Sequence, residues 1–259
     1  MTEYNDNQNV TEIPVCNILG INVAAINMEW LLKYLKKNIA SLKGCYICVS
    51  NVHTTVTAYE NPEYKFIQNN SLFVLPDGKP LSIIGKKRGF KNMDRITGPD
   101  FMENILSISE KKGWTHYFYG NTNENLDVLI NYLSSKYPKL IIKGFAPSKF
   151  RPLTKSEEIC FINQINSLNP DFVWVGIGAP KQEILCSKLA GATNSIWVGV
   201  GGAFNVIAGI IPRAPQWMQN LCLEWLYRLL KEPRRLFKRY FITNIKFLFY
   251  LFTNKEIKT

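Results

Sequence analysis

Short apolar runs, rich in β-branched and aromatic residues, alternate with helix-like segments along most of this 259-residue chain. Six of these runs have the length and composition of buried strands, and they lie at residues 46–50, 72–75, 115–119, 140–143, 172–175 and 196–200. Segments with helical spacing separate them, at residues 123–135, 155–168 and 180–190, and one further strand (15–23) and helix (28–39) come first. This alternation predicts an α/β fold in which a mainly parallel sheet carries helices on both faces.

The last part of the chain is strongly basic and aromatic. The net charge of the chain is +11, and residues 222–259 carry nine Lys or Arg against three Glu. We therefore expect an α/β core over residues 1–220 and a helical appendage over residues 221–259. Basic residues interleaved with aromatic rings suit a helix at the surface of an anionic membrane. The alternative is a terminal helix that packs on the core and keeps a solvated basic edge.

Cysteine use and the N-terminal segment favour a cytoplasmic protein. Cys45 and Cys48 form a C-x-x-C, but they lie in an apolar run, which favours two small residues of a buried strand over a redox pair. With two histidines in the chain, a four-ligand zinc site is hard to assemble, and we expect no metal site. The sequence shows neither a signal peptide nor a run of about 18 apolar residues that could span a bilayer.

Four turns are candidates for a ligand site, because parallel sheets bind ligands at the carboxyl ends of their strands. They are Ser50-Asn51, Pro76-Asp77-Gly78, the turn from Gly176 to Lys181, and the turn from Gly199 to Ala203. Neither glycine turn completes the dinucleotide pattern G-x-G-x-x-G, and the chain contains no P-loop and no G-x-S-x-G motif. A nicotinamide or flavin enzyme, a P-loop nucleotidase and a serine hydrolase are therefore disfavoured.

The glycine turns open helices, and a helix N-terminus holds phosphate oxygens through free amides and its dipole. The alternative is that each glycine merely allows a tight strand-to-helix turn. Asp77 lies where a carboxylate could take a proton from an attacking hydroxyl, or it could cap the helix that starts near Lys79. The chain has no Asp-x-Asp pair for a divalent metal, so arginines and helix termini would have to stabilise a leaving diphosphate.

These motifs together resemble the WecG/TagA/CpsF family of bacterial glycosyltransferases, from about Asn17 to Tyr240. The most specific matches are Gly176-Ile-Gly-Ala-Pro-Lys-Gln-Glu183, Val198-Gly-Val-Gly-Gly-Ala-Phe204, the segment from Ala208 to Trp217, Leu223-Glu-Trp-Leu-Tyr-Arg-Leu229 and Glu232-Pro-Arg-Arg235. Supporting matches are Asn51-Val-His-Thr54, Pro76-Asp-Gly-Lys-Pro80, Asp94-Arg-Ile-Thr-Gly98, Tyr119-Gly-Asn121 and Gly144-Phe-Ala-Pro147.

The resemblance implies a Rossmann-like fold and an inverting, metal-independent transferase without a cofactor. It implies a UDP-sugar donor, an acceptor sugar on polyprenyl diphosphate, and a peripheral position on the inner face of the cytoplasmic membrane. The family's catalytic base falls on Asp77, and its substrate-binding positions fall on Asn51, Arg95, Gln182, Arg228, Arg235, Lys238 and Arg239. Some members have a threonine where this chain has Val49, so we expect that polar contact to be lost or to be supplied by Ser50.

For the donor diphosphate we expect contacts from the two glycine turns, at Gly176, Gly178, Lys181, Gly199, Gly201 and Gly202. Two rival interpretations remain: a basic nucleic-acid-binding α/β protein, and a sugar-nucleotide epimerase or hydrolase on the same sheet. The first lacks a known nucleic-acid motif, and the second lacks the cofactor fingerprint. The identity of the sugar and of the polymer stays open, as does a homo-oligomeric state.

Overall fold

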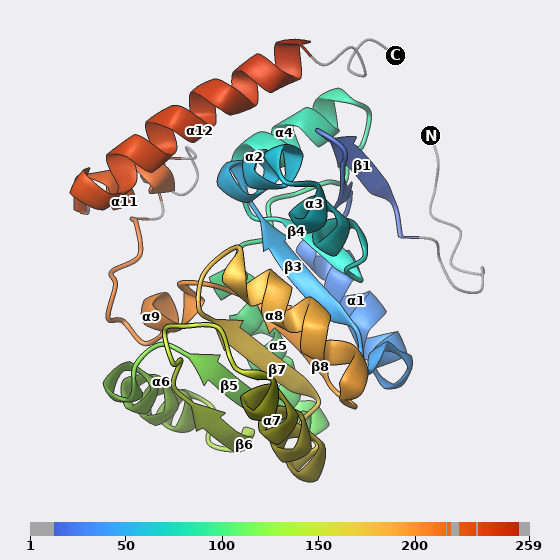
Figure 1. Ribbon diagram of the computed structural model, residues 1–259, viewed down its shortest axis with the longest axis vertical. Coiled ribbons are helices and arrows are strands. Elements are labelled where there is room, and N and C mark those ends of the chain that lie inside the picture. The colour runs from blue at the N-terminus through green and yellow to red at the C-terminus, as the bar shows by residue number, and fades with distance from the viewer. Residues whose placement is uncertain (1–12, 216, 219–222, 232, 254–259) are drawn as a thin grey trace.

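A six-stranded parallel sheet forms the centre of the molecule. The computed structural model describes residues 13–215, 217–218, 223–231 and 233–253. The strands are β3 (Tyr46–Ser50), β4 (Phe73–Pro76), β5 (Thr115–Gly120), β6 (Ile141–Ala146), β7 (Phe172–Gly176) and β8 (Ile196–Gly199), and they stand in the order β4-β3-β8-β7-β5-β6 (Figure 1). All five neighbouring pairs are parallel. The predicted α/β fold with a mainly parallel sheet is therefore confirmed.

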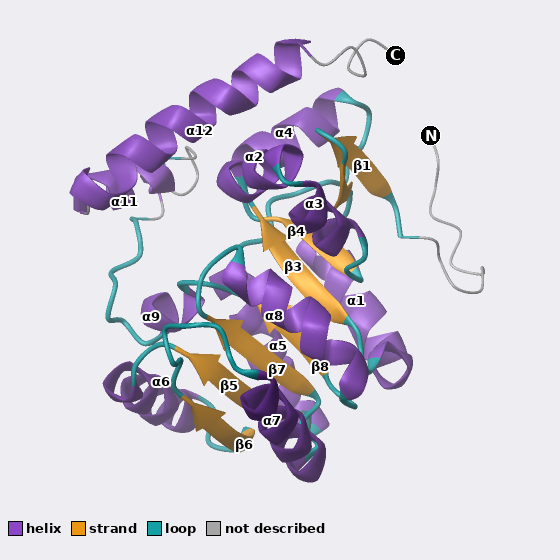
Figure 2. Ribbon diagram, viewed as in Figure 1, coloured by secondary structure: helices purple, strands orange, loops and turns teal. Residues whose placement is uncertain are grey.

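Helices cover both faces of this sheet (Figure 2). One face packs on α1 (Met28–Asn38), α5 (Gly98–Lys112), α6 (Asn123–Lys136) and α9 (Ala203–Ile207). The other face packs on α2 (Val52–Glu60), α3 (Pro62–Asn69), α7 (Lys155–Leu168) and α8 (Lys181–Leu189). The helix α4 (Lys79–Lys87) follows β4, and short 3₁₀ turns lie at Ile39–Leu42 and Ala190–Ala192.

The central strands are apolar on both sides because successive side chains enter different cores. In β7, Phe172 and Trp174 join the core under α5 and α6, whereas Val173 and Val175 join the core under α7 and α8. Since side chains alternate across a strand, a strand buried on both faces must be apolar at every position. This explains why these strands appear in the sequence as continuous apolar runs.

The first predicted strand, at residues 15–23, is wrong as a single element. The structure has an antiparallel hairpin there, β1 (Val15–Ile18) and β2 (Ile21–Ala24). Leu19 and Gly20 turn the chain with φ angles of 53° and 78°, and the Asn17 Oδ1 atom accepts a hydrogen bond from the Gly20 amide at 3.0 Å. A left-handed turn of two residues matches the twist of the flanking strands, which stabilises the hairpin.

Two helices form the described part of the C-terminal appendage, α11 (Glu224–Lys231) and α12 (Pro233–Thr253). The inner face of α12 packs on α2: Phe247 is 3% exposed and joins the same core as Val56. The Tyr59 and Tyr250 rings lie 4.5 Å apart, and the Tyr250 hydroxyl donates to Glu60 Oε1 at 2.6 Å. Within the described residues, no helix is long and apolar enough to cross a membrane.

Candidate active site

The turns that follow β3 and β4 meet at one edge of the sheet. The Asp77 amide donates to the Ser50 carbonyl at 2.8 Å, so the end of β4 is held against the end of β3. A Cβ atom at Gly78 would lie 3.3 Å from the Asn51 Cα, which leaves little space for any residue but glycine. Two of the sequence-predicted residues, Asn51 and Asp77, therefore lie side by side.

Asp77 is held by its backbone, and its carboxylate stays at the surface of the site. Its carbonyl accepts a hydrogen bond from Arg95 Nε at 2.6 Å, its Oδ1 lies 3.9 Å from Arg95 Nη2, and the side chain is 27% exposed. The N-cap residue of α4 is Gly78, which has no side chain to cap the helix. Asp77 is therefore not the N-cap residue of α4, and its catalytic role stays a prediction.

Arg95 connects this turn to the C-terminal appendage. Its Nη2 donates to Glu224 Oε2 at 2.6 Å, and Glu224, the first residue of α11, is buried. Burial would lower the pKa of Arg95, but the carboxylates of Asp77 and Glu224 outweigh this effect and raise it. The guanidinium is therefore charged, and it fixes both the Asp77 turn and the start of α11.

Asn51 and Ser50 serve the local structure of α2. The Asn51 Oδ1 atom accepts from the His53 and Thr54 amides at 3.0 and 3.3 Å, which makes Asn51 the N-cap of that helix. The Ser50 hydroxyl is fully buried and lies 2.8 Å from the Thr54 hydroxyl. Ser50 is therefore turned into the protein, which argues against the expectation that it replaces the threonine found before this asparagine in some family members.

The side chain of Gln182 connects the two glycine turns through hydrogen bonds. Its Oε1 atom accepts from the Gly178 amide at 3.1 Å and from the Gly201 amide at 2.9 Å. Its Cγ atom would lie 3.1 Å from a Cβ atom at Gly199, so the side chain packs directly on that turn. In this arrangement the Gly178 and Gly201 amides bind a side chain of the protein itself.

The other residues expected at the glycine turns lie around this connection. Gly176 faces the Phe204 ring, which lies 2.8 Å from where a Cβ atom would be. Gly178 and Gly201 have φ angles of 86° and 56°, a backbone conformation that glycine adopts most readily. The alternative that these two glycines allow a tight strand-to-helix turn is therefore supported. Lys181 is exposed as the first residue of α8, and Gly202 is the N-cap of α9.

Among the described residues, no group of three or more His, Cys, Asp and Glu side chains is arranged to hold a metal ion.

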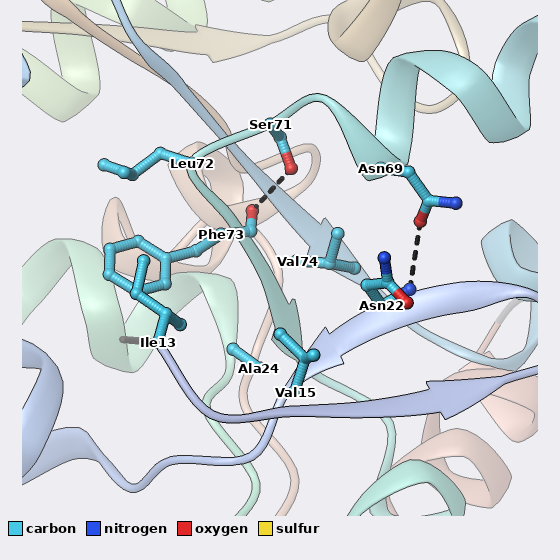
Figure 3. A pocket seen from close by; sticks show the side chains of 9 residues that line it. All are labelled: Ile13, Val15, Asn22, Ala24, Asn69, Ser71, Leu72, Phe73 and Val74. Atoms are coloured by element: carbon cyan, nitrogen blue, oxygen red, sulfur yellow. Dashed lines mark hydrogen bonds between the residues drawn. The ribbon is translucent and has the colours of Figure 1, made fainter. Parts of the chain in front are cut away.

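A cavity of about 130 Å³ lies away from this site, at the opposite end of β4 from Asp77 (Figure 3). It is lined by Ile13, Val15, Asn22, Ala24, Asn69, Ser71, Leu72, Phe73 and Val74. None of these side chains is charged, which makes the cavity a poor match for a diphosphate.

Comparison with known proteins identifies the family. The sequence model of the glycosyl transferase WecG/TagA/CpsF family matches residues 16–259. The chain belongs to this family. The resemblance seen in the sequence motifs is thereby confirmed, and the chain is a glycosyltransferase.

Two relatives are similar to this chain over most of their own length. Both are N-acetylglucosaminyldiphosphoundecaprenol N-acetyl-beta-D-mannosaminyltransferases. The protein of Bacillus subtilis (strain 168) is 30% identical over 211 residues, which is 81% of this chain and 80% of that protein. The protein of Bacillus spizizenii (strain W23) is 30% identical over 203 residues, which is 78% of this chain and 76% of that protein.

The basic residues that the family resemblance assigns to the site come from the two C-terminal helices. Arg228 belongs to α11, and Arg235, Lys238 and Arg239 belong to α12, but their side chains lie outside the described part of the structure. The Arg95–Glu224 ion pair shows that α11 begins next to Asp77. The sequence indicates Glu224 as part of the motif that begins at Leu223 and as one of three acidic residues in a basic tail, but it does not predict this contact.

Glu183 is a second residue that the sequence analysis missed, although it ends the motif Pro-Lys-Gln-Glu. Burial raises the pKa of Glu183 from 4.5 to about 7, against the opposing effect of its hydrogen bond from Gln182. Between about pH 4.5 and pH 7, the Glu183 carboxyl therefore keeps its proton in the folded protein and loses it in the unfolded chain.

This difference predicts a pH dependence of stability. As the pH rises from 5 to 8, the unfolding free energy of the wild type should fall by about 2–3 kcal/mol more than that of Glu183→Gln, because each pKa unit is worth about 1.4 kcal/mol. Urea titrations of both proteins at the two pH values measure the difference. Equal losses in both proteins would show that the carboxyl ionises normally in the fold.

Proposed function

We propose that this glycosyltransferase moves a sugar from a UDP-sugar to a sugar on polyprenyl diphosphate, with inversion and without a metal ion. The two Bacillus relatives carry an acceptor of this kind in their names, and they support N-acetylmannosamine as the first donor sugar to test. Its uronic acid and other hexoses are the further candidates. The product would enter teichoic acid or another cell-surface polysaccharide.

The observation that carries this proposal is the carboxylate of Asp77 at the carboxyl edge of the sheet, beside a charged arginine. In the proposed reaction Asp77 takes the proton from an acceptor hydroxyl while that oxygen attacks the anomeric carbon of the donor. The bond from the anomeric carbon to the diphosphate oxygen breaks on the opposite face, and UDP leaves. A single displacement of this kind inverts the configuration.

Negative charge grows on the diphosphate as the bond breaks, and preorganised donors stabilise it. We assign this role to the glycine turns after β7 and β8 together with Arg228, Arg235, Lys238 and Arg239. The cations would come from α11 and α12, which the Arg95–Glu224 pair attaches at the edge where Asp77 lies. Membership of the glycosyltransferase family favours this function over the nucleic-acid-binding alternative.

The test is release of UDP by the purified protein from a panel of UDP-sugars, in EDTA and detergent, with and without a short-chain polyprenyl diphosphate sugar. Acceptor-dependent release from one donor in EDTA is the expected result. It would establish the donor and the metal independence together. Release that requires added Mg²⁺ or Mn²⁺ would reject the metal-independent mechanism, and no release from any UDP-sugar would reject the donor class.

We further propose that the appendage, residues 221–259, binds the inner face of the cytoplasmic membrane, where a polyprenyl-linked acceptor resides. While Phe247 on the inner face of α12 packs on the core, seven large apolar side chains of the helix are exposed, and five of them follow one another at intervals of three or four residues. We call this set the outer stripe, and it consists of Phe237, Phe241, Ile245, Leu248 and Phe252. Its spacing of three and four residues places it on one side of the helix. Apolar residues beside the basic residues of the same segment suit an anionic bilayer surface.

Replacing three phenylalanines of the outer stripe (Phe237, Phe241 and Phe252) by serine should lower the affinity for phosphatidylglycerol vesicles at least tenfold. Each ring contributes apolar area that leaves water on binding. Vesicle co-sedimentation of the full chain measures the affinity. The matched control replaces three exposed apolar residues elsewhere, Phe66, Phe150 and Ile159, by serine. Equal losses in both variants would contradict a specific role of the outer stripe.

A further inference from the structure

Glu183 is a buried carboxyl for which the proposed mechanism has no use. It lies on α8, is 1% exposed, and its Oε1 atom accepts a hydrogen bond from Gln182 Nε2 at 2.8 Å. Its Oε2 atom has no hydrogen-bond partner among the described residues. Successive residues of a helix point about 100° apart, yet Gln182 and Glu183 are both buried. The two side chains buried at the N-terminal end of α8, next to the glycine turns, are thus both polar.

The surroundings of this carboxyl offer it no counter-charge. The titratable groups that face it are Tyr64 on α3, Cys48 on β3 and Cys186 on α8. The Tyr64 hydroxyl accepts from Gln68 Nε2 at 2.8 Å, and Tyr64 lies close enough to Glu183 to oppose the rise in the pKa of its carboxyl, but it carries no positive charge. Burying a carboxyl without a cation is unfavourable, so packing alone does not account for a glutamate at this position.

The effect of this carboxyl passes through the carboxamide of Gln182. A carboxamide has a donor end and an acceptor end, and its orientation depends on its partners. Because Glu183 accepts from Nε2, the Oε1 end faces the opposite way, toward the amides of Gly178 and Gly201. These amides belong to the turns after β7 and β8, so one hydrogen bond at Glu183 determines how both turns are held.

We propose that Glu183 is a positioning residue: its hydrogen bond from Gln182 orients the Gln182 carboxamide and so fixes the two glycine turns relative to each other. The catalytic consequence rests on the proposed function, because these turns are then the ones that receive the donor diphosphate. The structural consequence does not depend on the chemistry. Loss of the carboxyl should loosen the turns and raise the donor KM while kcat changes little.

The test compares Glu183→Leu with Glu183→Gln in the full chain. Leucine fills the space without accepting a hydrogen bond, whereas glutamine still offers an oxygen to Gln182. Hydrogen exchange at the Gly178 and Gly201 amides is measured by NMR, and donor KM and kcat are measured by UDP release. We expect Glu183→Leu to speed exchange at both amides at least tenfold and to raise the donor KM about tenfold. Glu183→Gln should stay within about twofold of the wild type for both quantities.

Two further variants make the result specific. Cys186→Ala opens space beside the same carboxyl without removing a partner of Gln182, and it should leave exchange at the two glycines unchanged. Glu183→Asp keeps the carboxyl but withdraws it by one methylene, and it should act like leucine; it also serves if Glu183→Leu does not fold. Unchanged exchange at Gly178 and Gly201 in folded Glu183→Leu or folded Glu183→Asp would overturn the proposal. Faster exchange with an unchanged donor KM would confirm the positioning and reject the assignment of these turns to the donor.

Discussion

Turnover of Asp77→Asn should be about 100- to 10,000-fold lower than that of the wild type, which is the range that a well-placed general base contributes. The donor KM should stay within about threefold, because the base acts on the acceptor proton in the transition state. The substitution keeps the size of the side chain and removes its ability to take a proton, together with the negative charge 3.9 Å from Arg95 Nη2. Steady-state UDP release with saturating acceptor measures both quantities.

The structure makes this a clean experiment, because the hydrogen bonds that hold the Asp77 turn use backbone atoms. The Asp77 amide donates to Ser50, and its carbonyl accepts from Arg95, so both bonds survive the replacement. Asp127→Asn is the matched control, since Asp127 is exposed on α6. Wild-type turnover in a folded Asp77→Asn enzyme would remove Asp77 from the mechanism.

The second large effect is expected where Arg95 meets Glu224. Glu224→Ala leaves a mostly buried guanidinium without its closest carboxylate, and we expect the free energy of unfolding to fall by about 2–4 kcal/mol. Turnover should also fall at least tenfold, because the start of α11 is no longer attached beside Asp77. Urea titrations measure the first effect, and UDP release measures the second.

A double-mutant cycle separates the ion pair from the packing of each side chain. If the pair holds the appendage, adding Arg95→Ala to Glu224→Ala should cost much less stability than Arg95→Ala does alone. Lys246→Ala is the control within the appendage, because its ion pair with Glu60 is exposed and should contribute little. Additive losses in the Arg95 and Glu224 variants would show that the two side chains act independently.

Most of the sheet could be predicted from the sequence because all of its strands but the exposed edge strand β6 are largely buried. A run such as residues 172–175 contains no polar residue, and its length sets it apart from a helix. The hairpin at residues 15–24 was not predicted, because its turn is Leu19-Gly20 instead of an Asn-Gly or Asp-Gly pair. A leucine with a positive φ angle is uncommon, so local sequence rules give no signal for a turn there.

The candidate site could be predicted as far as it follows the strands. Asp77 and Asn51 were found because parallel strands bring their carboxyl ends to one edge. The contact of Arg95 with Glu224 joins residues 129 positions apart, and periodicity along the chain contains no information on such a pair. Glu183 was missed for a different reason: a glutamate in the first turn of a helix is ordinarily a solvated partner of the helix dipole.

The place of β8 in the sheet has a consequence for synthesis of the protein. This strand is the last of the sheet in the chain, yet it pairs with both β3 and β7 and so joins the β4-β3 half to the β7-β5-β6 half. Until residues 196–199 have left the ribosome, the edges of β3 and β7 have no strand between them. Unpaired strand edges invite pairing with other chains, and contacts between distant residues form slowly. The nascent chain is therefore most exposed to aggregation just before β8 emerges, and chaperone binding should be strongest at that stage of translation.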